Sequence, residues 1–226
     1  MGAASACRQA GPPSIKEIMK QGILITLEGN EGCGKSTQIK LLYAYLKKKH
    51  KNVFLTREPG GTKIGDAIRQ VLLDPANKGM SAATETLLYM ASRAQIIEEV
   101  IKPRLQKGQI VLCDRWLDAT VAYQGFGGGV DVDWIRRLGQ EVTQSVTPQL
   151  SLYLDLPVKA GLKRATSHKK ADRMEQKNIS FHERVRKGFL WIAKKDPKRF
   201  KRIVLNPKDS IEVVFEKIKK EVERAV

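Results

Sequence analysis

Short apolar segments alternate with longer amphipathic ones along most of this chain. The apolar segments at 22–28, 53–56, 109–113, 150–154 and 202–205 are short and bounded by polar residues, which is typical of buried strands. Apolar residues at helical spacing predict helices over 36–48, 64–73, 82–107, 131–146, 158–165 and 179–195. A last helix is expected to begin at Asp209 or Ser210. Since proline interrupts helical hydrogen bonding, we expect the segment 82–107 to be interrupted or bent near Pro103.

Five strands separated by helices predict a parallel sheet covered on both faces, a three-layer α/β fold. We expect one such domain over residues 21–226, preceded by a flexible tail of residues 1–20. Ligands of these sheets bind beyond the carboxyl ends of the strands. Polar motifs follow the predicted strands at 29–36, 57–62, 114–124 and 157–173, so we expect them to share one rim.

The segment after the first strand fits the pattern G-x-x-x-x-G-K-[ST], a phosphate-binding P-loop. Its glycines allow backbone N–H groups to cradle phosphate oxygens, Lys35 reaches the β- and γ-phosphates, and the Ser36 hydroxyl can bind Mg²⁺. The following helix adds partial positive charge at its N-terminus. We read Cys33 as a small filler. The expected ATP-binding residues are Gly29, Asn30, Glu31, Gly32, Cys33, Gly34, Lys35, Ser36 and Thr37.

Composition excludes several classes of protein. The 226 residues contain no run of 18 apolar residues, so no transmembrane helix is predicted. Residues 1–20 lack the continuous apolar stretch of a secretory signal. The three cysteines have no metal-ligand or disulfide spacing, which favours a reducing, cytoplasmic location. His50 and His182 have no companion ligands in the sequence, and we expect both at the surface.

The formal net charge is +17, and it has two interpretations. One is nucleic-acid binding through phosphate neutralisation. The other is a solvated basic surface around a site for several phosphates. The basic clusters at 47–51, 194–202 and 217–220 are not interleaved with aromatic residues as base-stacking platforms are. We therefore favour the second interpretation and keep a nucleic-acid-dependent ATPase as the alternative.

Four further motifs narrow the choice among P-loop proteins. No N-K-x-D guanine motif is present, which argues against a GTPase, and the chain is short for a helicase or motor. The segments Thr56–Thr62, Ala91–Gln95, Cys113–Gly125 and Asp172–Gln176 follow the P-loop in fixed order. With these segments the sequence, from Gly22 to its C-terminus, resembles thymidylate kinases of the bacterial type.

The resemblance implies a fold, a reaction and partners. ATP and dTMP would react to give ADP and dTDP with Mg²⁺, in a P-loop fold with a mobile lid at about 166–176. Related enzymes form homodimers, so we expect a homodimer. Another nucleoside monophosphate is the alternative acceptor.

The resemblance also assigns the acceptor site. Arg115 and Arg69 would grip the dTMP phosphate in a bidentate manner, and Arg57 would assist them or pin its loop. Asp114 would bind Mg²⁺ or its waters together with Ser36, or serve as a cap or structural ion pair. Tyr89 would stack on thymine, Arg93 would donate to a thymine carbonyl, and Thr120 and Gln124 would read the base edge. Glu31 would accept from the sugar 3′-OH, and Tyr123 would lie against the sugar and disfavour a 2′-OH. Glu58 and Pro59 would line this pocket from their loop.

The lid departs from one common pattern of the family. Two early arginines of many bacterial members correspond here to Thr166 and His168, and the P-loop holds no arginine. Phosphoryl transfer requires cations at the transferring group. We therefore expect Arg173 and Arg164, helped by Lys169 or Lys170, to act beside Lys35 and Arg115 in catalysis.

Overall fold

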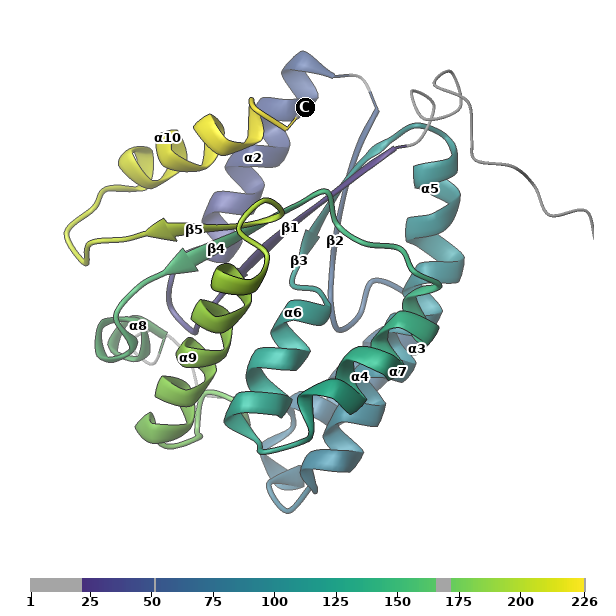
Figure 1. The fold of residues 1–226 in the computed structure, drawn as a ribbon, viewed down its shortest axis with the longest axis vertical. Coiled ribbons are helices and arrows are strands. Elements are labelled where there is room, and N and C mark those ends of the chain that lie inside the picture. Colours follow the sequence, from purple (N-terminus) through teal and green to yellow (C-terminus); the bar gives the residue numbers. More distant parts are fainter. Residues whose placement is uncertain (1–21, 51, 166–171, 226) are drawn as a thin grey trace, which may run out of the picture.

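The computed structural model describes residues 22–50, 52–165 and 172–225. Over these ranges the sequence forms one sheet of five parallel strands in the order β2-β3-β1-β4-β5 (Figure 1). The strands are β1 Ile23–Gly29, β2 Val53–Arg57, β3 Ile110–Asp114, β4 Leu150–Asp155 and β5 Phe200–Val204. The predicted α/β fold with a five-stranded parallel sheet is thus confirmed. The predicted tail at 1–20, residues 166–171 of the expected lid, and therefore Lys169 and Lys170, lie outside the described ranges.

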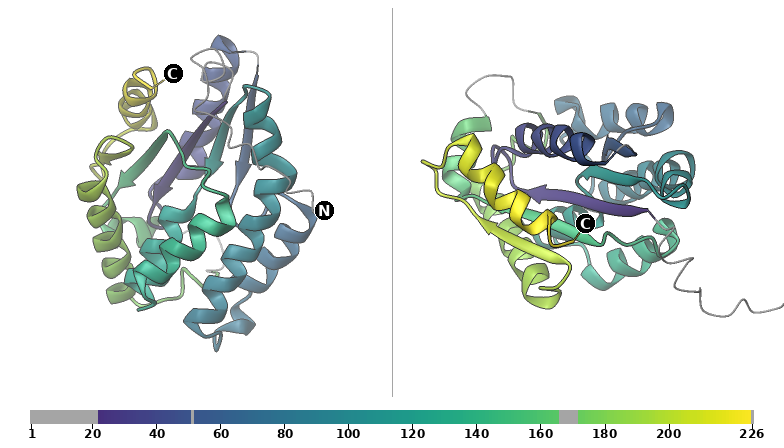
Figure 2. Two further views of the ribbon diagram at one scale, coloured as in Figure 1. Left: turned by 45° about the vertical axis from the view of Figure 1, so that its right-hand side comes forward. Right: turned by 90° about the horizontal axis from the view of Figure 1, so that it is seen from above.

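Helices cover both faces of the sheet (Figure 2), because neighbouring strand residues point to opposite sides. Ile25 belongs to one apolar cluster, together with residues of the helices α2 (Lys35–Lys49) and α10 (Ile211–Val222). Leu24, one position earlier, belongs to another cluster, with residues of α4 (Ala82–Ile96) and of the segment after it. The helices are α2 Lys35–Lys49, α3 Lys63–Leu73, α4 Ala82–Ile96, α5 Lys102–Gln106, α6 Leu117–Thr120, α7 Val132–Thr143, α8 Val158–Ala165, α9 Ile179–Lys195 and α10 Ile211–Val222, with a 3-10 turn η1 Pro75–Asn77. None of them is long and apolar enough to cross a membrane.

Side-chain caps define where several helices begin. Thr62, Ser81, Asn178 and Ser210 each accept a hydrogen bond from a backbone N–H in the first turn of the helix that follows. Such caps satisfy donors that have no partner within the helix. The predicted start of the last helix is therefore confirmed, with Ser210 as its cap.

The predicted interruption of the segment 82–107 near Pro103 is confirmed, because the π-helical stretch η2 Ile97–Ile101 ends just before this residue. Pro103 itself stands at the start of α5, where a missing N–H costs little. One helical stretch was not predicted. The periodicity missed α6 and the π-helix η3 Val121–Gly127. Most residues of this stretch are buried, so it shows no polar face and no amphipathic period.

The strand register brings the polar motifs together. Asp114, the last residue of β3, lies opposite Leu27 of β1 and Arg57 of β2. The P-loop, the loop after β2 and the segment after β3 therefore leave the same edge of the sheet, as the sequence predicts.

Candidate active site

The P-loop connects β1 to α2 and is held closely against α8. Gly34 has φ +93° and precedes the first turn of α2, a conformation that favours glycine. A side chain at Gly32 would place Cβ 1.9 Å from the carbonyl oxygen of Gly161 in α8. The backbones of the loop and α8 thus touch, and Gly32 has no room for another residue.

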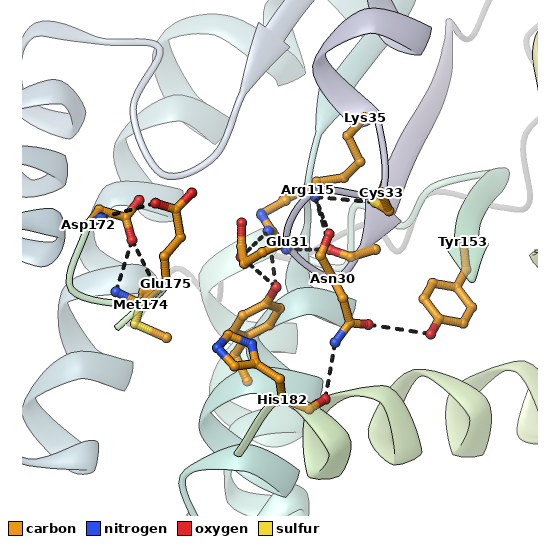
Figure 3. Close-up of polar contacts among 12 residues, drawn as sticks. Asn30, Glu31, Cys33, Lys35, Arg115, Tyr153, Asp172, Met174, Glu175 and His182 are labelled. Atoms are coloured by element: carbon orange, nitrogen blue, oxygen red, sulfur yellow. Dashed lines mark hydrogen bonds and ion pairs between the residues drawn. The ribbon is translucent and has the colours of Figure 1, made fainter. Parts of the chain in front are cut away.

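Lys35 points back into its own loop. Its Nζ donates to the carbonyl oxygens of Gly29 at 3.0 Å and Asn30 at 3.2 Å. Cys33 is buried, and its Sγ lies 3.8 Å from Nζ (Figure 3). The loop carbonyls therefore fix the ammonium group at the mouth of the phosphate cradle, and Cys33 fills the space beneath it.

Arg115 lies close to Glu31 of the P-loop (Figure 3), and the Tyr123 hydroxyl completes a polar cluster with them. Arg115 has φ +73°, a strained value for a residue with a side chain. Its guanidinium donates to Glu31 at 2.9 Å, to the Tyr123 hydroxyl at 3.1 Å and to the Gly29 carbonyl at 3.1 Å. Burial disfavours the Glu31 carboxylate, but Arg115 and Lys35, with a hydrogen bond from Tyr123, lower its pKa to about 2. Glu31 is therefore a carboxylate at neutral pH.

Three guanidinium groups surround one end of the central cavity. Arg57, Arg69 and Arg115 all line it. Arg69 donates to the Pro59 carbonyl at 2.9 Å, and Arg57 pairs with Asp66 at 3.2 Å. Burial and the neighbouring Arg57 lower the pKa of Arg69. Repulsion among these cations is relieved by an anion, so the structure supports both readings of Arg57: it pins its loop and adds charge at an anion site.

The opposite end of the cavity is a buried polar pocket. Arg93 donates from Nε to Glu58 at 2.7 Å and from Nη2 to the Thr120 hydroxyl at 3.1 Å. Gln124 donates from Nε2 to Glu85 at 2.7 Å. All five side chains are less than a tenth exposed. The pocket thus presents fixed donors and acceptors to a polar planar ligand.

The cavity of about 200 Å³ joins most of the side chains that the sequence singled out. Those that line it are Glu31, Lys35, Ser36, Glu58, Pro59, Arg69, Tyr89, Arg93, Asp114, Arg115, Thr120, Tyr123 and Gln124. Asp172, Met174 and Glu175 also line it, and the sequence did not assign them a ligand.

Arg164 and Arg173 do not line this cavity. Arg164, on α8, donates to the Pro207 carbonyl at 2.5 Å. Arg173 is buried, donates from Nε to the Leu72 carbonyl at 2.7 Å and pairs with Glu85 at 2.5 Å. The expectation that Arg173 faces the phosphates is therefore corrected: in this structure it lies behind the base end of the cavity.

His182 is the second correction, because it is not at the surface. It is fully buried on α9, and among the described residues neither ring nitrogen has a hydrogen-bond partner. Its backbone carbonyl accepts from Asn30 at 3.1 Å, which ties α9 to the P-loop (Figure 3). Phe181, Val185 and Phe189 share its buried helical face. That spacing was visible in the sequence and could have identified His182 as buried.

We expect His182 to make stability depend on pH. Burial lowers its pKa below the ordinary 6.5 and Arg115 adds to this, while Glu31, Glu175 and the Lys177 backbone oppose it. The unfolded chain then binds more protons between the two pKa values, so stability is lost as pH falls from about 7 to 5. In urea titrations over this range, His182→Phe should lose less stability than the unmodified chain. Parallel pH curves for the two proteins would contradict the prediction.

Glu28 is another buried group without a sequence signal. It is the residue before Gly29 in β1 and is fully buried, and among the described residues neither carboxyl oxygen has a hydrogen-bond partner. Burial and the nearby Asp118 raise its pKa well above the ordinary range. Burial thus disfavours the charged form of Glu28 next to the P-loop, where an isolated charge would be costly.

The fold and the cavity define a class of protein, the P-loop phosphotransferases that act on a small phosphorylated acceptor. The P-loop, a cluster of three guanidinium groups and a buried polar pocket open into one cavity. The family model described as thymidylate kinase matches residues 27–218. The chain belongs to the thymidylate kinase family.

Individual relatives agree with the family match. The chain is 52% identical to a thymidylate kinase of Geotalea daltonii over 79% of this chain and 87% of that protein. It is 47% identical to a thymidylate kinase of Deinococcus radiodurans over 86% and 94%, respectively. The crystal structure of thymidylate kinase from Ehrlichia chaffeensis has a TM-score of 0.73 and 34% identity, covering 89% of this chain and 99% of that one.

Proposed function

We propose that this protein transfers the γ-phosphoryl group of ATP to the phosphate of dTMP, giving ADP and dTDP. The observation that carries the proposal is the single cavity that joins the P-loop Lys35 to a guanidinium cluster and, beyond it, to a buried polar pocket. This arrangement offers one position for each part of a nucleoside monophosphate beside the phosphate cradle.

The guanidinium cluster suits the acceptor phosphate. Arg69 and Arg115 present planar donor pairs that match phosphate oxygens better than lysine does. Glu31 accepts from both Arg115 and Tyr123, so its carboxylate is positioned to accept from the sugar 3′-OH. Tyr123, against the sugar, leaves little space for a 2′-OH. Deoxyribose is therefore the favoured sugar.

The polar pocket suits thymine. Arg93 offers only N–H donors, which match a ring carbonyl oxygen. Thr120 and Gln124 stand along the same edge, and Tyr89 lines the cavity as a surface for stacking. Glu58 and Pro59 close the pocket from the loop after β2.

The residues at the P-loop fit a magnesium ion. Asp114 Oδ1 is buried and has no hydrogen-bond partner in the part of the chain that the structure describes, and Asp114 and Ser36 line the same cavity. Within the described ranges no group of three or more acidic, histidine or cysteine residues could hold a metal ion. Mg²⁺ in nucleotide sites uses one or two protein oxygens together with phosphates. When bound, it would neutralise charge on the phosphates.

Catalysis by the chain itself is mainly positioning and charge stabilisation. Lys35 and Arg115 line the space where the donor and acceptor phosphates would meet. Arg164 comes from α8, whose backbone touches the P-loop, so we retain it as the third cation. Arg173 is reassigned to the base pocket. Action in the cytoplasm and assembly as a homodimer are part of this proposal and rest on the family alone.

A screen of monophosphate acceptors tests the function. ADP release would be followed with dTMP, dUMP, dCMP, dGMP and dAMP as acceptors and with DNA and RNA as effectors. We expect turnover that depends on an acceptor and is fastest with dTMP. ATP hydrolysis that DNA or RNA stimulates, without any acceptor, would instead indicate the nucleic-acid-dependent ATPase.

We expect Asp114→Asn to weaken the use of Mg²⁺. The amide keeps the size of the side chain and removes the negative charge, so the Mg²⁺ concentration for half-maximal activity should rise about 10- to 100-fold, the scale of losses at metal-supporting residues. The measurement is a Mg²⁺ titration of turnover at saturating substrates. Asp118→Asn is not a suitable control because Asp118 is buried and pairs closely with Arg199; Asp133→Asn is suitable because the Asp133 side chain is exposed on α7.

A further inference from the structure

A buried carboxylate lies directly behind the base pocket and outside the main cavity. Glu85 is in the first turn of α4 and is 6% exposed. One of its oxygens accepts from Gln124 Nε2 at 2.7 Å, and the other pairs with Arg173 Nη1 at 2.5 Å. Gln124 comes from η3 and Arg173 from the segment before α9. Three parts of the chain therefore meet at Glu85.

Glu85 determines which end of the Gln124 amide faces the ligand. A carboxylate only accepts hydrogen bonds, whereas a side-chain amide has an NH₂ donor at one end and a carbonyl acceptor at the other. Since Gln124 turns Nε2 toward Glu85, its carbonyl oxygen is the atom left for the cavity that Gln124 lines. Without a carboxylate at position 85, the amide could rotate and present either end.

Arg173 stabilises the buried Glu85 carboxylate that orients Gln124. Its guanidinium is 2% exposed and is fixed by the Leu72 carbonyl at 2.7 Å. It supplies the counter-charge that a buried carboxylate needs. Arg173 and Gln124 therefore both direct N–H groups at the Glu85 carboxylate, one at each oxygen.

We propose that Glu85 is a specificity-determining positioning residue that makes Gln124 an acceptor for a pyrimidine carrying a proton on N3. Thymine and uracil carry that proton. Cytosine presents a lone pair at N3, which would face the lone pairs of Gln124. Cytosine also has an amino group where Arg93, a pure donor, needs a carbonyl. The inference rests on the proposed function and identifies how the same site rejects cytosine nucleotides.

Glu85→Gln tests this role with little change in shape. The comparison is kcat/KM for dTMP against 5-methyl-dCMP, which differs from dTMP only at the C4 substituent and N3. We expect kcat/KM for dTMP to fall about 10- to 100-fold, since a buried polar group loses its partner. The preference for dTMP over 5-methyl-dCMP should fall by a similar factor, while KM for ATP stays unchanged. An unchanged preference, or an equal loss with both nucleotides, would overturn the proposal.

Three further variants serve as a control, a test of rescue and a substitute for Glu85→Gln. Thr86→Val is the matched control, since Thr86 is buried next to Glu85 in the sequence and its hydroxyl donates within α4, to the Ala82 carbonyl; it should keep the wild-type preference. In the exchange Glu85→Gln with Gln124→Glu, the carboxylate moves to position 124 and remains an acceptor after rotation, so the preference should return. If circular dichroism shows that Glu85→Gln does not fold, Glu85→Asp, which withdraws the carboxylate from Gln124, replaces it in the same comparison.

Two outcomes separate the proposed function from the role of Glu85. If the unmodified chain does not phosphorylate dTMP, the proposed function fails. If it does and the variants keep the preference, only the role of Glu85 fails.

Discussion

Lys35→Ala should lose about 10²–10³-fold or more in kcat, the scale seen when one preorganised electrostatic group is removed. The ammonium group is held by the Gly29 and Asn30 carbonyls, so it needs little reorganisation to stabilise charge on the transferring phosphoryl group. Single-turnover kinetics at saturating ATP and dTMP would measure the loss without a contribution from product release.

Lys40→Ala provides the matched control. Lys40 is on the same helix, α2, but is exposed and does not line the cavity. Its removal should leave kcat within about twofold, because an exposed charge is screened by water and salt. Near-normal turnover of Lys35→Ala would show that this P-loop is not the catalytic one.

Arg93→Ala should be the most destabilising of the substitutions considered, by about 3–5 kcal/mol, because it leaves Glu58 buried without its partner. Both side chains of the pair are at most 3% exposed. Arg136→Ala is the comparison on the surface, since the pair with Asp133 is exposed and should contribute less than about 1 kcal/mol. Urea unfolding of both variants at pH 8 measures the difference.

The cost of Arg93→Ala should also depend on pH. Burial raises the pKa of Glu58, and Arg93 opposes that rise. Without Arg93 the pKa of Glu58 in the folded variant is higher still. Between this pKa and that of the unfolded chain, the folded variant keeps a proton on Glu58 that the unfolded chain has lost. The variant is then relatively more stable at pH 5 than at pH 8. Adding Glu58→Gln should recover part of the stability at pH 8 and remove this pH dependence; a variant equally stable at both pH values would contradict it.

The single variant Arg93→Ala should also impair the use of dTMP as the acceptor. A thymine carbonyl would lose its donor, which corresponds to about a 10- to 100-fold lower kcat/KM for dTMP. KM for ATP should change little, because Arg93 bonds to Glu58 and Thr120, which lie on the loop after β2 and on α6. An unchanged preference among acceptors would place the base elsewhere.

Local patterns predicted most of the fold. The helices at 158–165 and 179–195 were predicted with the bounds that α8 and α9 have. Their apolar residues repeat at helical spacing because one face of each helix packs against the rest of the protein. The stretch 117–127 escaped prediction because it is buried on nearly all sides. A helix without a polar face has no amphipathic period to detect.

What the sequence determined by itself is the chemistry of single motifs: a phosphate cradle, its lysine, an arginine-rich acceptor site and a parallel sheet that gathers them at one edge. These depend on residue type at short spacing. Only the tertiary structure decided which charged groups meet. Glu85 resembles an ordinary acid in the first turn of a helix, and Arg173 resembles a lid cation, until three distant segments pack together and pair them. Which charged side chains pair depends on contacts between remote parts of the chain and on exclusion of water around them. Neither produces a periodic pattern in the sequence.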